Sequence, residues 1–211
     1  RRKAALDEAA ASLGGGEAIA ADVADESSVV ALFDEARARV GSCDLLVNCA
    51  GVAGGGPTVE MSGASFSHVL AVNVTGTFLC AREAMKQMCA AGGGGRIVNV
   101  GSIAGIRGIG SSIPYAVSKG AVHTLTLSLA RVLGPNIRMN AIAPGFIAGE
   151  WLEEGLGEAF ENAKKAREES AILSKVCSPS DVADAIISLI TGSDLVTGQV
   201  LVCDGGALLA E

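Results

Sequence analysis

The chain alternates between helical and strand-like patterns of apolar residues along its whole length. In the helical segments apolar residues recur at three- and four-residue intervals, whereas the strand-like segments are short continuous apolar runs that end in glycine turns. We therefore predict helices over residues 1–13, 26–40, 64–90, 114–133 and 180–191, and strands over residues 18–23, 44–51, 96–102, 137–145 and 199–206. Strands that alternate with helices in this way are typical of a parallel sheet with helices on both faces.

Length and composition suit one folded domain. The 211 residues are enough for a full hydrophobic core, and 49% are apolar against 18% charged, which is far from the composition of a disordered chain. Because the sequence has no internal repeat and no linker, we expect a single domain over residues 1–211. In such a sheet ligands bind outside the carboxyl ends of the strands, so the chemistry is expected there.

Charge and cysteine usage narrow the partners and the compartment. The formal net charge is −7, and no cluster of Lys or Arg offsets it, so we expect small-molecule ligands rather than a nucleic acid or an anionic membrane. No uninterrupted apolar run reaches the roughly 20 residues of a membrane span. The six cysteines form no CxxC pair; we interpret them as reduced thiols, which predicts a cytoplasmic protein without a metal site.

Tyr115 and Lys119 form the pair with the clearest chemical potential. They lie four residues apart in YAVSK and so share one face of the predicted helix 114–133. A phenol with a pKa of about 10 is a weak acid–base catalyst at neutral pH, but a nearby ammonium group lowers that pKa. The pair therefore suits general acid–base catalysis. Taken alone, such a spacing more often belongs to an ordinary amphipathic helix.

Three polar residues lie where they can join this pair. Ser102 ends the strand that precedes Tyr115, Asn48 ends another strand, and Asn73 lies in the middle of the predicted helix 64–90, where an amide is a weak helix former. Each of them taken alone is typical of a turn or a helix cap.

Taken together, these residues and their surroundings resemble the short-chain dehydrogenase/reductase family. The matching motifs follow the family's order and cover nearly the whole chain: DV (22–23), NCAG (48–51), VNVTGTF (72–78), IVNVGSIAG (97–105), YAVSKGAV (115–122), IRMNAIAPGF (137–146) and VTGQVLVCDGG (196–206). The resemblance implies a Rossmann-like, doubly wound parallel sheet that here lacks the family's first two strands and first helix. The glycine-rich turn that cradles the cofactor pyrophosphate is then missing too, which predicts weak cofactor binding.

The resemblance implies an NAD(P)-dependent oxidoreductase that transfers a hydride between the nicotinamide and a carbonyl or secondary alcohol. Tyr115 would donate a proton to the carbonyl oxygen, and Ser102 would hydrogen-bond that oxygen. Lys119 would bind the nicotinamide ribose and lower the pKa of Tyr115. Asn73 would seat a water molecule that relays protons.

The resemblance also implies three groups of cofactor contacts. Asp22 and Val23 would frame the adenine; Asn48, Cys49, Ala50 and Gly51 would pass beside the adenosine ribose; and Pro144, Gly145 and Ile147 would line the nicotinamide. Arg1 falls just after the position where the family's second strand ends. Since an arginine near that position favours a 2′-phosphate, we expect NADP in preference to NAD.

Substrate and assembly are less constrained. The expected pocket walls, residues 103–114 and 146–174, favour a small or medium apolar carbonyl or alcohol, and a 3-oxoacyl reductase-like activity stays open. The alternatives are a catalytically silent binding module and a lyase or epimerase that uses the same Tyr–Lys pair. The resemblance further implies a homodimer or homotetramer built on helices 64–90 and 114–133. Their apolar stripes either meet a partner copy or face the sheet: Leu79, Ala84, Met88, Val122, Leu125 and Leu129.

Overall fold

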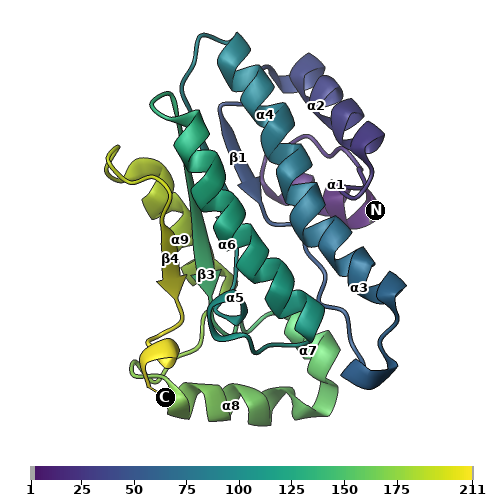
Figure 1. The fold of residues 1–211 in the computed structure, drawn as a ribbon, viewed down its shortest axis with the longest axis vertical. Helices are drawn as coiled ribbons and strands as arrows, with labels where there is room; N and C mark the ends of the chain where they lie inside the picture. The colour runs from purple at the N-terminus through teal and green to yellow at the C-terminus, as the bar shows by residue number, and fades with distance from the viewer. Residues whose placement is uncertain (1–2, 211) are drawn as a thin grey trace.

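Four parallel strands form the centre of the computed structural model, which describes residues 3–210 (Figure 1). They are β1 (Leu45–Asn48), β2 (Gly95–Val100), β3 (Ile137–Pro144) and β4 (Val200–Cys203), and they lie side by side in chain order. The register pairs Asn48 with Asn99 and Pro144 with Cys203. All four carboxyl ends therefore lie at one edge of the sheet, which confirms the expected α/β, Rossmann-like class.

Helices cover both faces of this sheet and its carboxyl edge. Helices α2 (Glu26–Val40), α4 (Thr77–Ala90) and α6 (Ile113–Leu133) pack on one face, and α9 (Pro179–Thr191) packs on the other. Helix α8 (Phe160–Ser170) runs across the strand ends, with α7 (Glu150–Leu156) beside it (Figure 1). Two further helices are α1 (Lys3–Ser12) and the short α5 (Ala104–Arg107). The ligand-binding edge is thus enclosed by α5, α7 and α8.

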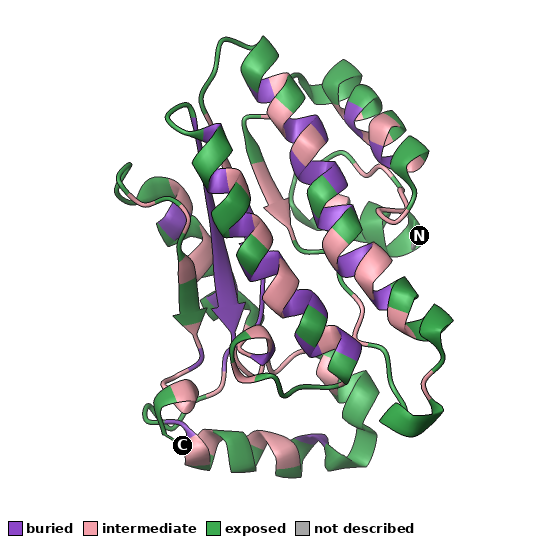
Figure 2. Cartoon of the chain, viewed as in Figure 1, coloured by how far each residue is buried: buried purple, intermediate pink, exposed green. Residues whose placement is uncertain are grey.

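The apolar stripes of the two long helices face the sheet. Leu79, Ala84 and Met88 are buried in one cluster with Ile97 of β2 and Met139 of β3. All eight residues of β3 are buried, and Figure 2 shows α6, with its purple bands, beside this strand. The stripe of α4 and Val122 of α6 are therefore buried in the core of one chain, whereas Leu125 and Leu129 stay partly exposed.

Residues 63–90 form one continuous helical segment with an irregular centre. Helix α3 (Gly63–Leu70) passes through a π-helical stretch (Ala71–Gly76) into α4. Asn73 lies in this stretch, and π-helical insertions widen a helix so that a side chain can be re-aimed. By length and composition the segment could cross a membrane, but 44% of its most apolar window is buried. It packs on β1 and β2 as a core helix does.

The predicted strand over residues 18–23 is wrong. These residues are irregular, and their polar groups form local bonds: the Asp22 N–H donates to Ser28 Oγ (2.8 Å), and the Ala24 N–H donates to Asp22 Oδ1 (3.1 Å). An extended segment becomes a strand only by pairing, and no strand of the described chain lies between it and β1. Arg1 lies outside the described residues.

Gly76 holds the turn at Val23 against the central helix, and we predict that Gly76→Ala destabilises the chain. A Cβ at position 76 would lie 2.9 Å from Val23 Cγ2 and 3.0 Å from the Val23 carbonyl oxygen. Such overpacking costs about 1–3 kcal/mol, of which the better helix propensity of Ala recovers up to about 1 kcal/mol. We expect urea unfolding to show a net loss of about 1–2 kcal/mol.

Gly63→Ala is the matched control, because a Cβ there meets no heavy atom within 4 Å. Its free energy of unfolding should be unchanged or slightly higher. Equal stabilities of the two variants would show that the contact between Gly76 and Val23 carries no strain.

Candidate active site

Helix α6 presents Tyr115 and Lys119 to the carboxyl edge of the sheet. The helix begins where Ser112 accepts a hydrogen bond from the Tyr115 N–H (3.3 Å), next to Pro114 in the first turn. The Lys119 side chain is 5% exposed, and its Nζ lies 5.6 Å from the centre of the Tyr115 ring. This ammonium donates a hydrogen bond to the Val100 carbonyl oxygen at the end of β2 (2.7 Å). The predicted neighbourhood of the two side chains is thus present.

Ser102 reaches the same place from the end of β2. Helix α5 follows it and packs on α6 without intervening side chains: a Cβ on Gly105 would lie 2.5 Å from the Gly120 nitrogen and 2.5 Å from the Lys119 carbonyl carbon. The Ser102 N–H also donates to Nε2 of the buried His123 (3.4 Å). Burial, together with the nearby Lys119 charge, lowers the pKa of His123 and keeps it neutral as an acceptor.

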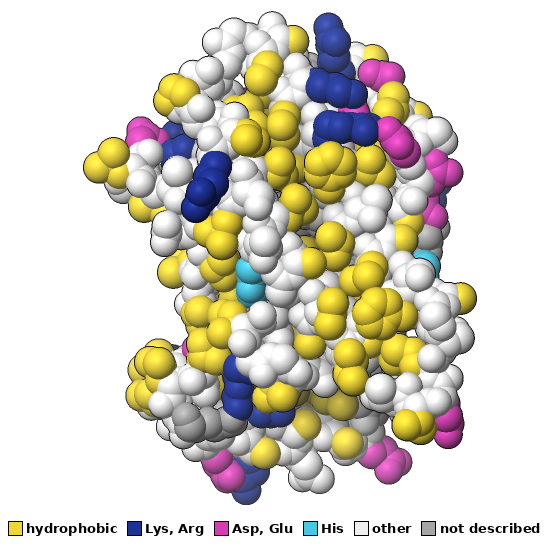
Figure 3. Space-filling view, viewed as in Figure 1, with side chains coloured by type: hydrophobic (Ala, Val, Ile, Leu, Met, Phe, Trp, Pro, Cys, Tyr) yellow, Lys and Arg dark blue, Asp and Glu magenta, His cyan; other side chains and the backbone are white. Residues whose placement is uncertain are grey.

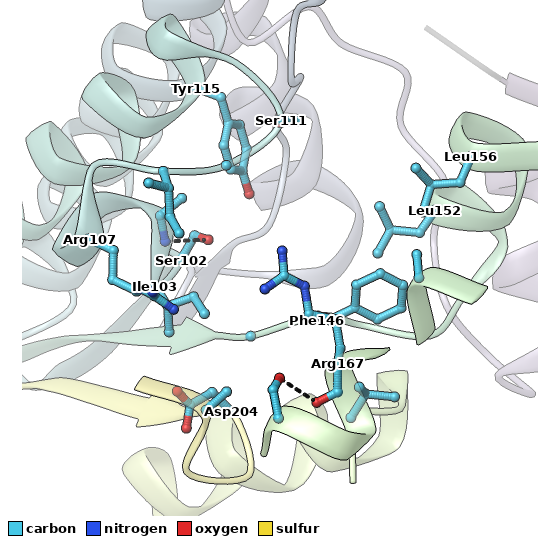
Figure 4. Close-up of a pocket in the computed structure, with 18 of the residues that line it drawn as sticks. Ser102, Ile103, Arg107, Ser111, Tyr115, Phe146, Leu152, Leu156, Arg167 and Asp204 are labelled. Carbon is cyan, nitrogen blue, oxygen red and sulfur yellow. Dashed lines mark hydrogen bonds between the residues drawn. The ribbon is translucent and has the colours of Figure 1, made fainter. Parts of the chain in front are cut away.

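A cavity of about 440 Å³ opens in front of these hydroxyls. Figure 4 shows Ser102 and Tyr115 on one side of it, with Phe146, Leu152 and Leu156 on the other. The second wall comes from the chain after β3 and from α7, which fill most of it with apolar carbon. A small molecule in this cavity can therefore present an oxygen atom to both hydroxyls while its remainder lies against an apolar surface.

Burial is the main influence on the pKa values of Tyr115 and Lys119. Loss of solvent raises the pKa of Tyr115, and the Ser102 side chain opposes this as a hydrogen-bond partner of the phenol. Lys119 is not among the causes of this shift, so its expected lowering of the Tyr115 pKa stays a prediction. Burial also lowers the pKa of Lys119 to about 8, with Cys49 opposing. At neutral pH the phenol is protonated.

Asn73 ties the turn after β1 to helix α6. Its Nδ2 donates to the Val52 carbonyl oxygen (2.8 Å) and to Ser118 Oγ (2.9 Å), and its Oδ1 accepts from the Val52 N–H (2.8 Å). Both amide hydrogens are thus used within the protein. A relay water held by this side chain has only the second lone pair of Oδ1 to bind.

The other predicted cofactor residues lie along the same edge of the sheet. Cys49, Ala50 and Gly51 are exposed after β1, whereas Pro144 and Gly145 end β3 beside Cys203 and Asp204. The remaining three are partly exposed: Asp22, Val23 and Ile147. Arg1 lies outside the described residues.

The residues near Lys119 fit the ribose of a dinucleotide. A Cβ on Gly51 would lie 3.4 Å from Asn73 Oδ1 and 3.7 Å from Lys119 Nζ, so the glycine leaves space between two polar groups. Within the described chain the Lys119 ammonium makes one hydrogen bond, to Val100. Its two other N–H groups can therefore donate to ribose hydroxyls.

Asn48 points into the protein instead of towards this edge. Its Nδ2 donates to Asn99 Oδ1 (2.9 Å), and Asn99 donates in turn to Thr126 Oγ1 (2.9 Å). This chain of amides and hydroxyls joins β1, β2 and α6. Sequence reasoning missed Asn99, Thr126 and His123 because each lies in an apolar run and has no chemical signature of its own.

Comparisons with known proteins agree with this geometry. A family model described as enoyl-(acyl carrier protein) reductase matches residues 1–207. The cis-4-hydroxycyclohexanecarboxylate dehydrogenase of Sinomonas cyclohexanicum is 39% identical over 188 residues, which are 88% of this chain and 74% of that protein. Among solved structures, NAD⁺-bound xylitol dehydrogenase has a TM-score of 0.89 at 29% identity, covering 97% of this chain and 86% of that one. NADP-bound ElxO has a TM-score of 0.80 at 33% identity, covering 89% and 76%.

Fold, site and relatives together define the class of the protein. It is an α/β oxidoreductase that acts on CH–OH groups with NAD or NADP. The chain belongs to the short-chain dehydrogenase/reductase family.

The buried ammonium predicts a pH-dependent effect of Lys119→Met on the stability of the cofactor-free chain. The folded-state pKa of about 8 lies below the reference value of 10.5, so the folded state binds fewer protons between these values and its stability rises with pH there. Below pH 8 the charged lysine costs up to about 3 kcal/mol, and Met removes this cost. Urea unfolding should show Lys119→Met gaining stability relative to wild type at pH 7 and losing that advantage near pH 10.5.

Other titrating groups are common to both proteins and cancel in the difference between them. A stability difference that stays constant from pH 7 to pH 10.5 would contradict a depressed pKa of Lys119.

Proposed function

We propose that this protein interconverts a carbonyl group and a secondary alcohol on a small or medium substrate, with Tyr115 as general acid and base. One observation carries the proposal: the Ser102 and Tyr115 hydroxyls face one cavity, and a buried ammonium lies directly behind them. Hydroxyls on an ordinary helix surface would not share a partly apolar cavity with a desolvated lysine.

Four residues of the chain each have a separate role in the proposed reaction. In the direction of reduction, Tyr115 donates its proton to the carbonyl oxygen, and Ser102 holds that oxygen by a hydrogen bond. The nicotinamide cofactor, when bound, supplies the hydride that the carbonyl carbon receives. Lys119 binds the ribose with its free N–H groups and passes a proton to the phenolate after each turnover. Asn73 keeps the turn at Val52 in place beside Lys119.

NADP is the preferred cofactor in this proposal. The support is the sequence position of Arg1, where a basic residue suits a 2′-phosphate. The remaining contacts would come from Asp22 and Val23 at the adenine end, and from Gly51 and Lys119 at the ribose. NAD-bound and NADP-bound relatives both have this fold, so competition between the two cofactors tests the preference.

We also propose a cytoplasmic homo-oligomer. The six cysteines are free thiols, which supports a reducing compartment. Helices α4 and α6 keep apolar side chains on their outer faces: Phe78 is 39% exposed, Val117 47% and Leu127 48%. Figure 3 shows hydrophobic atoms gathered over this face of the molecule, and such a surface supports contact with a second copy.

We predict that Tyr115→Phe abolishes turnover and leaves cofactor affinity nearly unchanged. The ring stays in place, but the proton that the carbonyl oxygen needs is gone, and general acid catalysis is worth about 10²–10⁴-fold. The measurements are kcat from NADPH absorbance with a panel of ketones, and cofactor affinity from NADPH fluorescence. Ser128→Ala, which removes a hydroxyl from the exposed side of α6, is the control and should behave as wild type.

Other outcomes would replace the proposal. A variant that keeps more than about a tenth of the wild-type kcat would remove Tyr115 from the reaction. A wild-type chain that binds NADPH without turnover would be a silent module. Product formation without net oxidation of NADPH would identify a lyase or an epimerase.

A further inference from the structure

A positively charged side chain points into the substrate cavity from helix α8. Figure 4 shows the Arg167 guanidinium directed towards the space between Ser102 and Tyr115 on one side and Leu152 on the other. Within residues 3–210, no hydrogen bond or ion pair is made by this guanidinium. Lys165 of the same helix differs, because its ammonium lies 3.9 Å from Glu169 and its side chain is not among the residues that line the cavity.

The charges around the cavity leave this cation uncompensated. Arg107 and Lys175 also line it, while Asp204 is the one carboxylate among its lining residues. Asp204 is occupied by the backbone: its oxygens accept from the Gly206 N–H (2.8 Å) and the Leu208 N–H (2.7 Å). The one carboxylate that lines the candidate active site is thus already bonded to backbone N–H groups and does not pair with Arg167.

The cavity surface between Arg167 and the Ser102 and Tyr115 hydroxyls is mainly apolar. Phe146, Leu152 and Leu156 form the wall beside Arg167, and Phe146 packs on Phe160 of α8 with ring centres 6.0 Å apart. A cavity of about 440 Å³ accepts a molecule of modest size. It suits one with a reacting carbon at one end, a hydrocarbon middle and an anionic group at the other end.

We propose that the substrate carries an anionic group, with a carboxylate as its simplest form, and that Arg167 recognises this group. The inference rests on the proposed carbonyl–alcohol chemistry and names its substrate class. A guanidinium can donate two parallel hydrogen bonds to a carboxylate, which fixes the orientation of the molecule as well as its affinity. The expected substrate, a small or medium apolar carbonyl or alcohol, thereby becomes a molecule with an apolar spacer between the reacting carbon and an anionic group.

The relevant experiment measures binding separately from turnover. Trp151 is the only tryptophan of the chain and lines the cavity, so its fluorescence reports occupancy. We would titrate the full chain with 4-oxocyclohexanecarboxylate and with the matching neutral carboxamide, and measure kcat/KM for both with NADPH. The proteins are wild type, Arg167→Gln, Arg167→Lys, and Lys165→Gln as a control that removes a charge from the same helix outside the cavity.

Wild type and Lys165→Gln should bind the acid about tenfold or more tightly than the amide, as expected for a charged hydrogen-bonded pair. Arg167→Gln should lose this preference and keep its affinity for the amide, which also shows that it is folded. Arg167→Lys should keep part of the preference. In turnover, the loss in Arg167→Gln should fall on KM for the acid, with kcat little changed.

Two results would overturn the inference: equal binding of acid and amide by wild type, or an unchanged preference in Arg167→Gln. Failure of the proposed function looks different. In that case neither compound is turned over, while the preference for the acid persists in the fluorescence titration. Tyr115→Phe provides the same separation, because it should lose turnover of both compounds and still prefer the acid.

Discussion

The close contact between Gly105 and the backbone of α6 is the constraint on which the site depends. With a Cβ at position 105 only 2.5 Å from Gly120 and Lys119 backbone atoms, no larger residue fits unless α5 moves away. Helix α5 directly follows Ser102, so any such movement would carry the Ser102 hydroxyl away from Tyr115. A backbone-to-backbone contact therefore sets the distance between the Ser102 and Tyr115 hydroxyls, the two groups proposed to act on the substrate oxygen.

The same packing buries Lys119, and this burial costs desolvation free energy. Desolvation disfavours its charge, and a single hydrogen bond to Val100 offsets only part of the cost. The unsatisfied hydrogen-bonding capacity of this ammonium favours binding of a polyhydroxylated group beside it. Burial of Lys119 thus lowers the stability of the cofactor-free chain and at the same time favours cofactor binding. Buried ionisable groups with shifted pKa values are common at functional sites.

The sequence predicts the elements that depend on local pattern and misses those that depend on distant partners. The strands at 44–51 and 137–145, helix α6 and the cluster of Ser102, Tyr115 and Lys119 follow from periodicity and motifs. Residues 18–23 have a strand-like pattern but belong to no strand in the part of the chain that the structure describes. Burial raises the pKa of Tyr115, and the sequence does not predict this because burial is a tertiary property. Arg167 lies in a polar helix without any motif, so only the fold reveals its direction.

The residues proposed for proton transfer and the residue proposed for substrate recognition lie on elements that are packed to different degrees. Ser102 and Tyr115 belong to elements packed backbone to backbone and anchored on a fully buried strand. Helix α8, in contrast, buries a single residue, Phe160, and its Arg167 is exposed at the mouth of the cavity. Substitutions on α8 disturb few packed atoms, whereas substitutions near Gly105 disturb the catalytic distance itself. On the proposed function, substrate preference can therefore change through α8 while the geometry of Ser102 and Tyr115 stays constant.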